Sequence, residues 1–512
     1  MPIGRTHAIS LLGLEGAVVE IEADISSNLP AFVLIGLPDA ALGEAKDRVR
    51  SAATNSGCGL PNRKITVNLS PAALPKHGSG FDLGIAIAAL AAAGSVDVES
   101  IDRVVHLGEL GLDGRLRPIN GILPAVLAAA RAGFATVMVP TGNADEAALV
   151  PGIRVVGIAS LRDAAIWHGG AFEPIVVEPI LRPVAETPDE EYPLDLADVI
   201  GNSEAVEALV VAAAGGHHVF FLGPPGAGKT MLAARLPGLL PELDVRAALE
   251  VSSIRSLAGL PVRPVLLMRP PFESPHHTAT AASLLGGGTG QIRPGAAARA
   301  AHGVLFLDEA PEFASSVLDA LRQPLESGLI TIHRANAVAH FPGNFQLVLA
   351  ANPCPCGQYG ARDSDCTCSP MVRRRYLARL SGPLLDRIDI QFRVQRVTSA
   401  ILRVAGQQER ISSATARERV ESARARSANR LADTPWTVNS HVPGAWLRGP
   451  AARLGSSITT AIDRALERGG ITMRGYDRVL RLAWTLADLD DVDKPGADHI
   501  GRALYLRRAI SS

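Results

Sequence analysis

Residues 219–236, "VFFLGPPGAGKTMLAARL", decide how the middle of this chain folds. An apolar run typical of a buried strand is followed by Gly-x-x-x-x-Gly-Lys-Thr and then by a helical pattern, the context in which a glycine-rich loop binds phosphate. Amides of residues 226–229 can surround a β-phosphate. Lys229 can reach the β- and γ-phosphates, and the Thr230 hydroxyl can bind Mg²⁺. We therefore predict an ATP and Mg²⁺ site formed by Gly223, Pro224, Pro225, Gly226, Ala227, Gly228, Lys229 and Thr230.

A second apolar strand, in "GVLFLDEAPEF" (303–313), ends in two acids, Asp308 and Glu309. Such a strand end is common by itself, but after a phosphate-binding loop it is typical of a Walker B motif. We predict that Asp308 holds the Mg²⁺ through water and that Glu309 orients and deprotonates the attacking water.

The composition describes a packed globular chain. Its 512 residues suggest about three domains, and its 47% hydrophobic and 20% charged residues are ordinary for such domains. Only 4% of residues are aromatic, so the cores must be built from Ala, Val, Leu and Ile. The formal net charge of −1 excludes a general basic footprint, so any nucleic acid must bind to local patches.

No segment predicts a membrane or secretory role. The N-terminal "MPIGRTHAISLLG" has too short an apolar run for a signal peptide. The longest apolar run, "FDLGIAIAALAAAGSV" (81–96), is too short to span a bilayer and has Asp82 at its head. We expect a cytoplasmic protein without a membrane partner.

The chain divides by pattern into an α/β unit, a linker, a second α/β unit and a helical region. The segments "AVVEIEADI", "KITVNLS" and "ATVMVP" predict strands, and "ALGEAKDRVRSAATNSG" and "GILPAVLAAARAG" predict helices that end at glycine. The proline- and acid-rich stretch 172–195 reads as a linker or, alternatively, as an acidic docking segment. The predicted boundaries are 1–170, 171–195, 196–395 and 396–512.

Several stretches together resemble the magnesium-chelatase-like AAA+ ATPases, and most closely their YifB/ComM branch. They are "VIGNSEAVEALVVAAAGGHHVFFLGPPGAGKTMLAARLPGLLP", "RPPFESPHHTATAASLLGGG", "GVLFLDE", "ANPCPCG", "SGPLLDRIDI" and the N-terminal "LLGLEGAVVEIEADISSNLPAFVLIGLPDAALGEAKDRVRSA". The resemblance covers nearly the whole chain. It implies a P-loop AAA+ core with a C-terminal helical lid, a homo-oligomeric ring, expected to be a hexamer, and an ATP-driven DNA helicase that promotes branch migration during DNA uptake and recombination.

The resemblance also implies three further catalytic residues. Asn352, at the end of "FQLVLAAN", falls at sensor 1, although a turn asparagine before proline is the alternative. Arg387 falls where related helicases carry an arginine finger that acts on the neighbouring subunit. Arg474, in "ITMRGYDRVL", falls at sensor 2 and is expected to act on the nucleotide of its own chain. Arg478 and Arg481 are expected on a solvated or interface face.

The N-terminal region resembles the proteolytic domain of Lon in "PKHGSGFDLGIAIAAL" and "GELGLDGRLRPINGILPAVLAAARAG". Lon's nucleophilic serine falls on Asp82 and its lysine on Leu123, while Ser79 and Lys76 are out of register. A Ser–Lys dyad needs a serine whose proton a neutral lysine can accept. We therefore predict a proteolytically inactive scaffold or DNA-binding domain.

Three regions are candidates for contact with DNA. "SPHHTATAASLLGGGTGQIRPGAAARAAHG" (274–303) reads as an insertion with a loop directed at a ring pore. "LITIH" and "AVAHF" predict a hairpin whose tip residue, Arg334, would contact phosphates. Basic clusters lie at residues 373–375 and 417–430. The alternatives are ordinary surface loops and solvated faces.

Four of the five cysteines lie in "ANPCPCGQYGARDSDCTCSP" (351–370), and Cys58 stands alone. Cys354, Cys356, Cys366 and Cys368 are predicted to hold a structural Zn²⁺, because four thiolates suit a tetrahedral site. Ordinary reduced thiols are the alternative.

The sequence therefore predicts an oligomeric ATPase that moves DNA. A chelatase-type motor that remodels a partner protein is the first alternative, and a non-enzymatic ATP-binding scaffold is the second.

Overall fold

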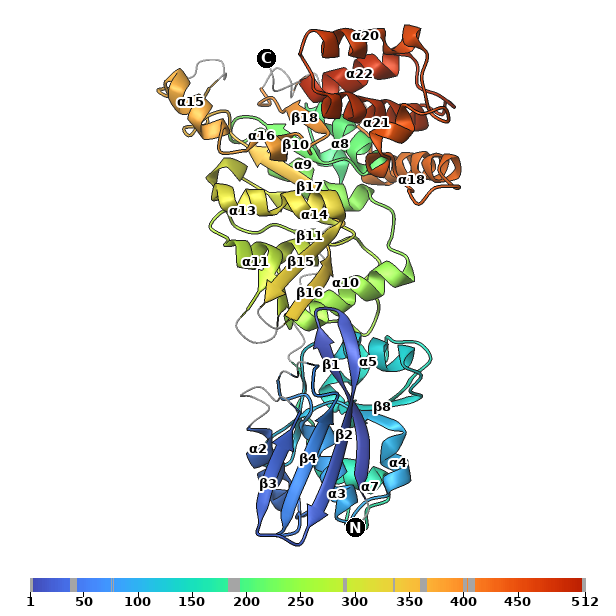
Figure 1. Ribbon diagram of the computed structural model, residues 1–512. Helices are drawn as coiled ribbons and strands as arrows, with labels where there is room; N and C mark the ends of the chain where they lie inside the picture. The colour runs from blue at the N-terminus through green and yellow to red at the C-terminus, as the bar shows by residue number, and fades with distance from the viewer. Residues whose placement is uncertain are drawn as a thin grey trace.

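The computed structural model describes residues 3–36, 44–74, 76, 78–182, 194–288, 292–334, 337–359, 366–398, 403 and 410–508. Figure 1 shows an elongated molecule in which an N-terminal α/β part, a central α/β part and a C-terminal group of helices follow one another. Much of the predicted linker, residues 183–193, and residues 289–291 of the predicted insertion lie outside the described residues. The predicted α/β class with a helical C-terminal region is confirmed.

The N-terminal part is built on a seven-stranded sheet of order β3-β4-β2-β1-β5-β8-β9. The three predicted strands correspond to β2, β4 and β8, and the two predicted helices to α2 and α5. The strands are β1 (Gly4–Leu12), β2 (Glu15–Ser26), β3 (Ala31–Ile35), β4 (Lys64–Ser70), β5 (Val104–His106), β8 (Thr136–Pro140) and β9 (Arg154–Ile158). The helices include α2 (Ala45–Asn55), α3 (Asp82–Ala92), α4 (Val98–Asp102), α5 (Ile122–Arg131) and α7 (Leu161–Trp167).

The longest apolar run of the sequence forms α3, whose residues are all buried. This helix lies against β1 and β2, so its uniform hydrophobicity reflects burial on every side. Among the described residues, no helix combines the length and hydropathy that a bilayer crossing requires.

The central sheet has five strands in the order β11-β14-β17-β10-β18, and every neighbouring pair is parallel. Strands β10, β14 and β17 are buried along their whole length, as expected for a parallel sheet covered on both faces. Their carboxyl ends therefore meet at one edge. The strands are β10 (Val219–Leu222), β11 (Phe272–Glu273), β14 (Val304–Leu307), β17 (Gln346–Ala351) and β18 (Ile390–Arg393).

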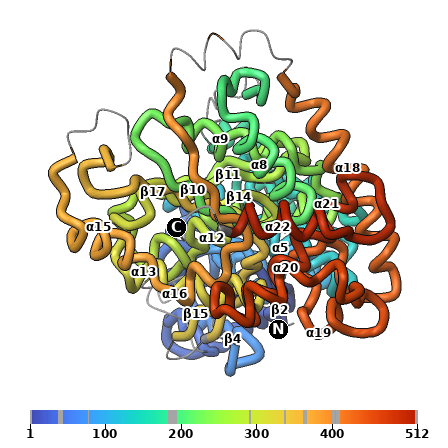
Figure 2. The backbone as a smooth tube through the Cα atoms, turned by 90° about the horizontal axis from the view of Figure 1, so that it is seen from above, coloured from blue at the N-terminus to red at the C-terminus, as the bar shows by residue number. Residues whose placement is uncertain are grey.

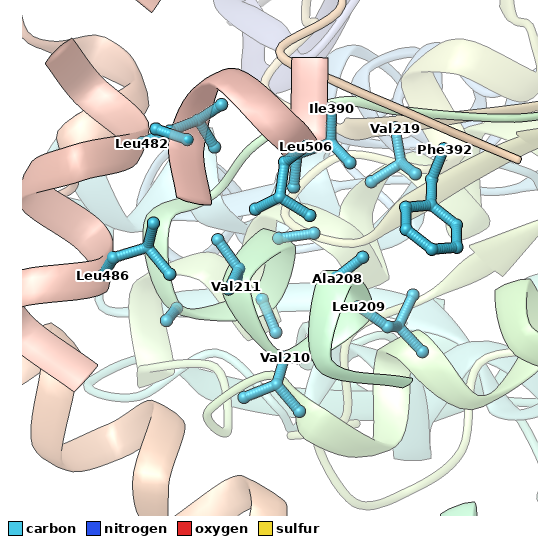
Figure 3. Packing of buried hydrophobic residues seen from close by; sticks show 14 of the residues in the cluster. Ala208, Leu209, Val210, Val211, Val219, Ile390, Phe392, Leu482, Leu486 and Leu506 are labelled. Atoms are coloured by element: carbon cyan, nitrogen blue, oxygen red, sulfur yellow. The ribbon is translucent and has the colours of Figure 1, made fainter. Parts of the chain in front are cut away.

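Helices cover both faces of this sheet. On one face, α8 packs between β10, β18 and the C-terminal helices, and Figure 3 shows Val211, Leu482 and Leu506 meeting in this core. The covering helices of the central part are α8 (Ser203–Gly215), α9 (Lys229–Arg235), α10 (Val245–Ala258), α11 (Ala281–Leu285), α12 (Ala296–Arg299), α13 (Ser315–Ala320), α14 (Arg322–Ser327), α15 (Pro370–Leu377) and α16 (Gly382–Leu385). The C-terminal helices are α18 (Ser413–Arg430), α19 (Gly444–Leu447), α20 (Ser456–Glu467), α21 (Met473–Leu489) and α22 (Ala497–Arg508).

The predicted hairpin is confirmed as β15 (Leu329–Arg334) paired antiparallel with β16 (Ala337–Pro342). The hairpin contacts the N-terminal part, because β1 lies against β16. Leu11, Leu12 and Leu14 of the N-terminal part also pack on the central hydrophobic core. A second contact joins α5 to α10, where the Gly121 amide donates to the Ser256 carbonyl at 3.1 Å. The N-terminal part is therefore docked through both an apolar and a polar contact.

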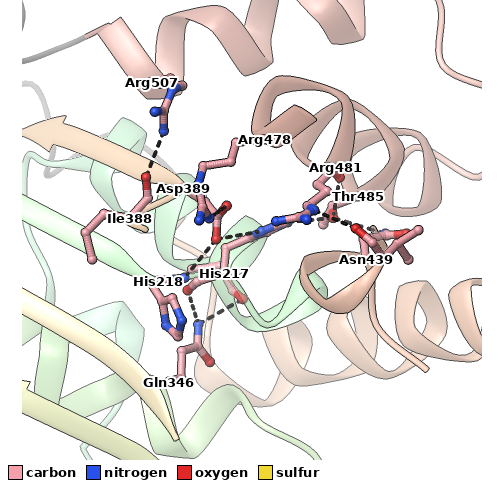
Figure 4. Close-up of polar contacts among 12 residues, drawn as sticks. His217, His218, Gln346, Ile388, Asp389, Asn439, Arg478, Arg481, Thr485 and Arg507 are labelled. Atoms are coloured by element: carbon pink, nitrogen blue, oxygen red, sulfur yellow. Dashed lines mark hydrogen bonds and ion pairs between the residues drawn. The ribbon is translucent and has the colours of Figure 1, made fainter. Parts of the chain in front are cut away.

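A buried carboxylate joins the central sheet to the C-terminal helices. Asp389, 1% exposed, precedes β18 and pairs with Arg478 of α21, whose Nη1 lies 2.5 Å from its Oδ1. His217 Nδ1 lies 3.4 Å from Oδ2, and the His218 amide donates to Oδ2 (Figure 4). Burial by itself raises the pKa of Asp389, but Arg478 and His217 outweigh it and hold the pKa well below the usual value.

Arg478 and Arg481, predicted on a solvated or interface face, instead make contacts within the chain. Arg478 forms an ion pair with Asp389, and Arg481 Nε donates a hydrogen bond to the Val442 carbonyl at 2.8 Å. Both arginines lie on the inner side of α21 because they connect the helix to the rest of the molecule.

Asp389→Asn is expected to destabilise the junction between sheet and C-terminal helices by about 3–5 kcal/mol, because Arg478 loses its buried counter-charge. The midpoint of urea unfolding, followed by tryptophan fluorescence, measures this. Asp113→Asn removes the exposed pair with Arg115, whose side chains are 50% and 42% exposed, and should cost less than about 1 kcal/mol. Equal shifts in the two variants would contradict the structural role of Asp389.

Candidate nucleotide-binding site

The glycine-rich loop leaves β10 after Leu222 and enters α9 at Lys229. Gly226 and Gly228 have φ angles of +73° and +90°, and a Cβ at either position would meet nothing within 4 Å. Glycine is therefore required here for the left-handed backbone rather than for space. The loop borders a cleft of about 660 Å³, which is lined by Asp198, Val199, Ile200, Asn202, Pro225, Gly226, Ala227, Gly228, Lys229, Thr230, Met231, Asp308, Glu309, Asn352 and Val397.

Lys229 lies at the base of this cleft and is 8% exposed. Its Nζ donates to the carbonyls of Gly223 and Pro224, at 2.7 and 3.0 Å, and to Asn352 Oδ1 at 3.0 Å. Burial lowers the pKa of Lys229, while Asp308 and Glu309 oppose that shift. The ammonium group is thus fixed by weak neutral acceptors, which a phosphate oxygen can replace with a stronger, charge-assisted bond.

The two residues predicted to hold Mg²⁺ are in direct contact. Thr230 Oγ1 donates to Asp308 Oδ2 at 2.7 Å, so the hydroxyl that follows the phosphate loop meets the end of β14. Hydroxyl and carboxylate oxygens are ligands that suit Mg²⁺. This donor set fits the metal that accompanies a nucleoside triphosphate.

Glu309 has a φ of +49°, a left-handed conformation that is uncommon for a residue other than glycine. Such strain gathers at functional sites. The Glu309 amide donates to Asp308 Oδ1 at 2.9 Å, and its Oε2 lies 3.5 Å from His277 Nδ1. The carboxylate is 50% exposed at the cleft, where a water molecule can reach it.

Asn352 lies directly after β17, which runs between β14 and β10 in the sheet. Its bond to Lys229 brings the predicted sensor 1 residue to the same cleft as the phosphate loop and the two acids. Three strand ends therefore supply the predicted phosphate, metal and water-activating groups.

Arg387 and Arg474 do not line this cleft. Arg387 Nη1 donates to the Pro383 carbonyl at 2.6 Å, and its guanidinium pairs with Glu326 of α14.

Arg474 is exposed in the first turn of α21 and is not among the residues that line the cleft, so the structure does not bring it to the phosphate loop of its own chain as the resemblance predicted. The physical reason lies in how α21 is anchored. A Cβ on its Gly475 would come within 3.3 Å of Arg507, whose Nη1 donates to the Ile388 carbonyl (Figure 4). The start of α21 thus lies beside the loop that carries Arg387.

Sequence reasoning missed two polar side chains near the cleft. His277, from the insertion, approaches Glu309, and Asn202 Nδ2 donates to the Ala227 carbonyl at 3.2 Å. The stretch that contains His277 was predicted to be a loop that contacts DNA, and the stretch that contains Asn202 was noted only for its resemblance to the family. Neither has a spacing that would mark it as part of a nucleotide site.

The N-terminal region holds no Ser–Lys pair among its described residues. Asp82, at the serine position, is fully buried and accepts from Arg48 Nε at 2.7 Å; burial raises its pKa to about 6, although Arg48 opposes this. Leu123 is buried in the core. Lys76 Nζ donates hydrogen bonds to three backbone carbonyls, and the Ser79 hydroxyl donates a hydrogen bond to the Glu109 carboxylate.

Three family models match most of the chain. "Magnesium chelatase, subunit ChlI" matches residues 195–402, "Subunit ChlI of Mg-chelatase" matches residues 21–143, and "Magnesium chelatase, subunit ChlI C-terminal" matches residues 410–507. These matches cover the central part, the N-terminal part and the C-terminal helices respectively.

Several curated proteins are similar over their full length. An uncharacterized protein of Mycobacterium tuberculosis is 47% identical over 509 residues, 99% of each chain. Competence protein ComM of Haemophilus influenzae is 39% identical over 510 residues, 100% of this chain and 98% of that protein. Uncharacterized protein YifB of Escherichia coli is 38% identical over 517 residues, 99% of this chain and 97% of that protein.

A shorter similarity concerns the N-terminal region. A Lon protease of Mycolicibacterium smegmatis is 30% identical over 181 residues, 33% of this chain and 23% of the protease. The N-terminal part is thus Lon-like in fold. The full-length similarities and the P-loop core together show that the chain belongs to the YifB/ComM family of magnesium-chelatase-like AAA+ ATPases.

Proposed function

We propose that this protein is a ring-forming ATP hydrolase, a hexamer, whose turnover moves DNA and drives branch migration. The observation that carries the ATPase part is the convergence of Lys229, Thr230, Asp308, Glu309 and Asn352 on one cleft. The DNA part is supported by the hairpin β15–β16 and by the similarity to a protein named as a competence protein.

Within one subunit, the geometry suggests a division of roles. Lys229 and the loop amides bind the β- and γ-phosphates, while Thr230 and Asp308 hold Mg²⁺, which neutralises charge that develops on the transferred phosphoryl group. Glu309 orients the attacking water and accepts its proton. Asn352, bonded to Lys229 Nζ, is placed to detect the γ-phosphate.

Two arginines would complete the site from the neighbouring subunit. The first turn of α21, which carries Arg474, lies near the loop that carries Arg387, because Arg507 contacts both Gly475 and the Ile388 carbonyl. We propose that both act in trans, which revises the own-chain role expected for Arg474. Arg387 must leave Glu326 to reach a neighbour's γ-phosphate, so ring assembly would couple to hydrolysis.

We propose that DNA contacts the hairpin at Arg334, the last residue of β15, whose guanidinium would meet backbone phosphates without reading sequence. Since the net charge is −1, binding must rest on such local groups and should weaken steeply with salt.

A chelatase-type motor that remodels a partner protein is the second candidate, favoured by the three magnesium-chelatase family matches. It uses the same ATPase site but needs no DNA, so the response to DNA separates the two.

Lys229→Ala and Glu309→Gln are expected to lower kcat for ATP at least about 100-fold, because one loses the phosphate contact and the other the base. Lys229→Ala should also lose nucleotide affinity, whereas Glu309→Gln should keep it. Steady-state hydrolysis and binding of a fluorescent ATP analogue measure the two effects. Normal hydrolysis by either variant would refute the site.

Mixing Arg387→Ala with Lys229→Ala is expected to restore part of the hydrolysis that each variant lacks alone. In a mixed ring, an intact cleft of the first variant can receive Arg387 from the second. The same mixture with Arg474→Ala tests the second arginine. Mixtures as inactive as their components, in rings shown by light scattering to exchange subunits, would place these arginines in cis.

Forked or four-way DNA is expected to stimulate hydrolysis and to undergo ATP-dependent strand displacement. Arg334→Ala should weaken the stimulation at least several-fold while leaving the basal rate intact, since Arg334 is outside the cleft. Arg131→Ala, which removes an exposed arginine of α5, is the matched control, and Glu309→Gln should displace no strand. Hydrolysis indifferent to every DNA would favour the protein-remodelling motor.

A further inference from the structure

Four cysteine side chains converge on one point just after the sensor position. The Sγ atoms of Cys354, Cys356, Cys366 and Cys368 all lie within 4.8 Å of one another. Cys354 Sγ lies 3.3 Å from Cys356 Sγ and 3.8 Å from Cys366 Sγ, and the last two sulfurs are 3.6 Å apart. The first pair, Cys354 and Cys356, and the second pair, Cys366 and Cys368, thus bring their thiol groups together.

These separations exclude two of the chemistries open to four cysteines, a disulfide and an iron–sulfur cluster. A disulfide needs sulfurs about 2.05 Å apart, and all four cysteines are free. An iron–sulfur cluster places iron and sulfide between the thiolates and holds them further apart. A single Zn²⁺ with Zn–S bonds of about 2.3 Å in a tetrahedron requires sulfurs about 3.8 Å apart. The observed spacing fits the last case.

We propose that Cys354, Cys356, Cys366 and Cys368 bind one Zn²⁺ in a closed tetrathiolate site. All four coordination positions are taken by protein, so no position is left for a water or substrate and the metal is structural. Neither the family matches nor the relatives' names assign a metal to these residues.

The metal would hold the loop against the nucleotide cleft. Cys354 is fully buried and accepts from the Gly357 amide through its carbonyl at 2.9 Å. Gly357 has a φ of +77°, and a Cβ there would come within 2.6 Å of Pro225 in the phosphate loop. The loop begins two residues beyond Asn352, at Cys354, and therefore lies in close contact with the wall of the cleft at Gly357.

The same site would also set the position of α15. This helix begins at Pro370, two residues after Cys368, and is capped by Ser369. The guanidinium of Arg373 stacks 3.7 Å from the ring centre of Tyr359, which belongs to the cysteine loop. Figures 1 and 2 place α15 at the periphery of the central part, on the side away from α18. Among the residues of this projecting helix only Tyr376 is buried, so a metal at its base would anchor it.

The test is metal analysis of the full chain, purified without chelators. We expect one zinc ion per chain, and four thiols that react with a thiol reagent only after the metal is removed. Reconstitution with Co²⁺ should give thiolate-to-cobalt charge transfer and the intense visible bands of a tetrahedral site. The spectra use the unmodified chain, so the outcome does not depend on whether a variant folds, and no measurement depends on ATP or DNA.

Variants locate the site. Cys356→Ser and Cys366→Ser should each lower bound zinc to below about 0.1 per chain, whereas Cys58→Ser, at the buried fifth cysteine, should leave it unchanged. Hydrogen exchange in α15 should rise on zinc removal. A reduced chain that holds no zinc and gives no tetrahedral cobalt spectrum would overturn the proposal, as would iron in place of zinc or full zinc retention in both serine variants.

Discussion

The buried carboxylate of Asp389 is the interaction on which the arrangement of the upper half of the molecule depends. It receives Arg478 from α21 and two histidine contacts from the segment before β10, so one charge ties together β18, β10 and the C-terminal helices (Figure 4). A charge in this position is costly unless its partners are held in place. The position of the helical lid is therefore determined as much by this pair as by apolar packing.

That position also affects where the two predicted arginines lie. Because α21 is anchored at Arg478 and beside Arg507, its first turn lies next to the loop that carries Arg387. The residues predicted to bind phosphate and Mg²⁺ and to activate water line one cleft, and neither Arg387 nor Arg474 is among the residues that line it.

The N-terminal domain has a Lon-like fold but, among its described residues, lacks the Ser–Lys pair of that protease. The position of the nucleophile carries Asp82, which Arg48 neutralises inside the core, and Lys76 binds carbonyl oxygens in place of a serine. The outer surface of this domain contacts the rest of the molecule. The tip of β1–β2 and helix α5 pack against the central part, close to hairpin β15–β16. The N-terminal domain is thus in direct contact with the hairpin.

The sequence by itself determined the local elements of the site and the class of fold. The phosphate loop can be predicted from Gly226, Gly228 and Lys229 because phosphate binding requires those residue types at a fixed spacing. The strands β10, β14 and β17 can be predicted because buried parallel strands are uniformly apolar. The approach of His277 to Glu309, the burial of Arg478 and the place of Arg474 were decided only by tertiary structure. Each depends on a contact between residues far apart in the chain, for which short-range periodicity carries no signal.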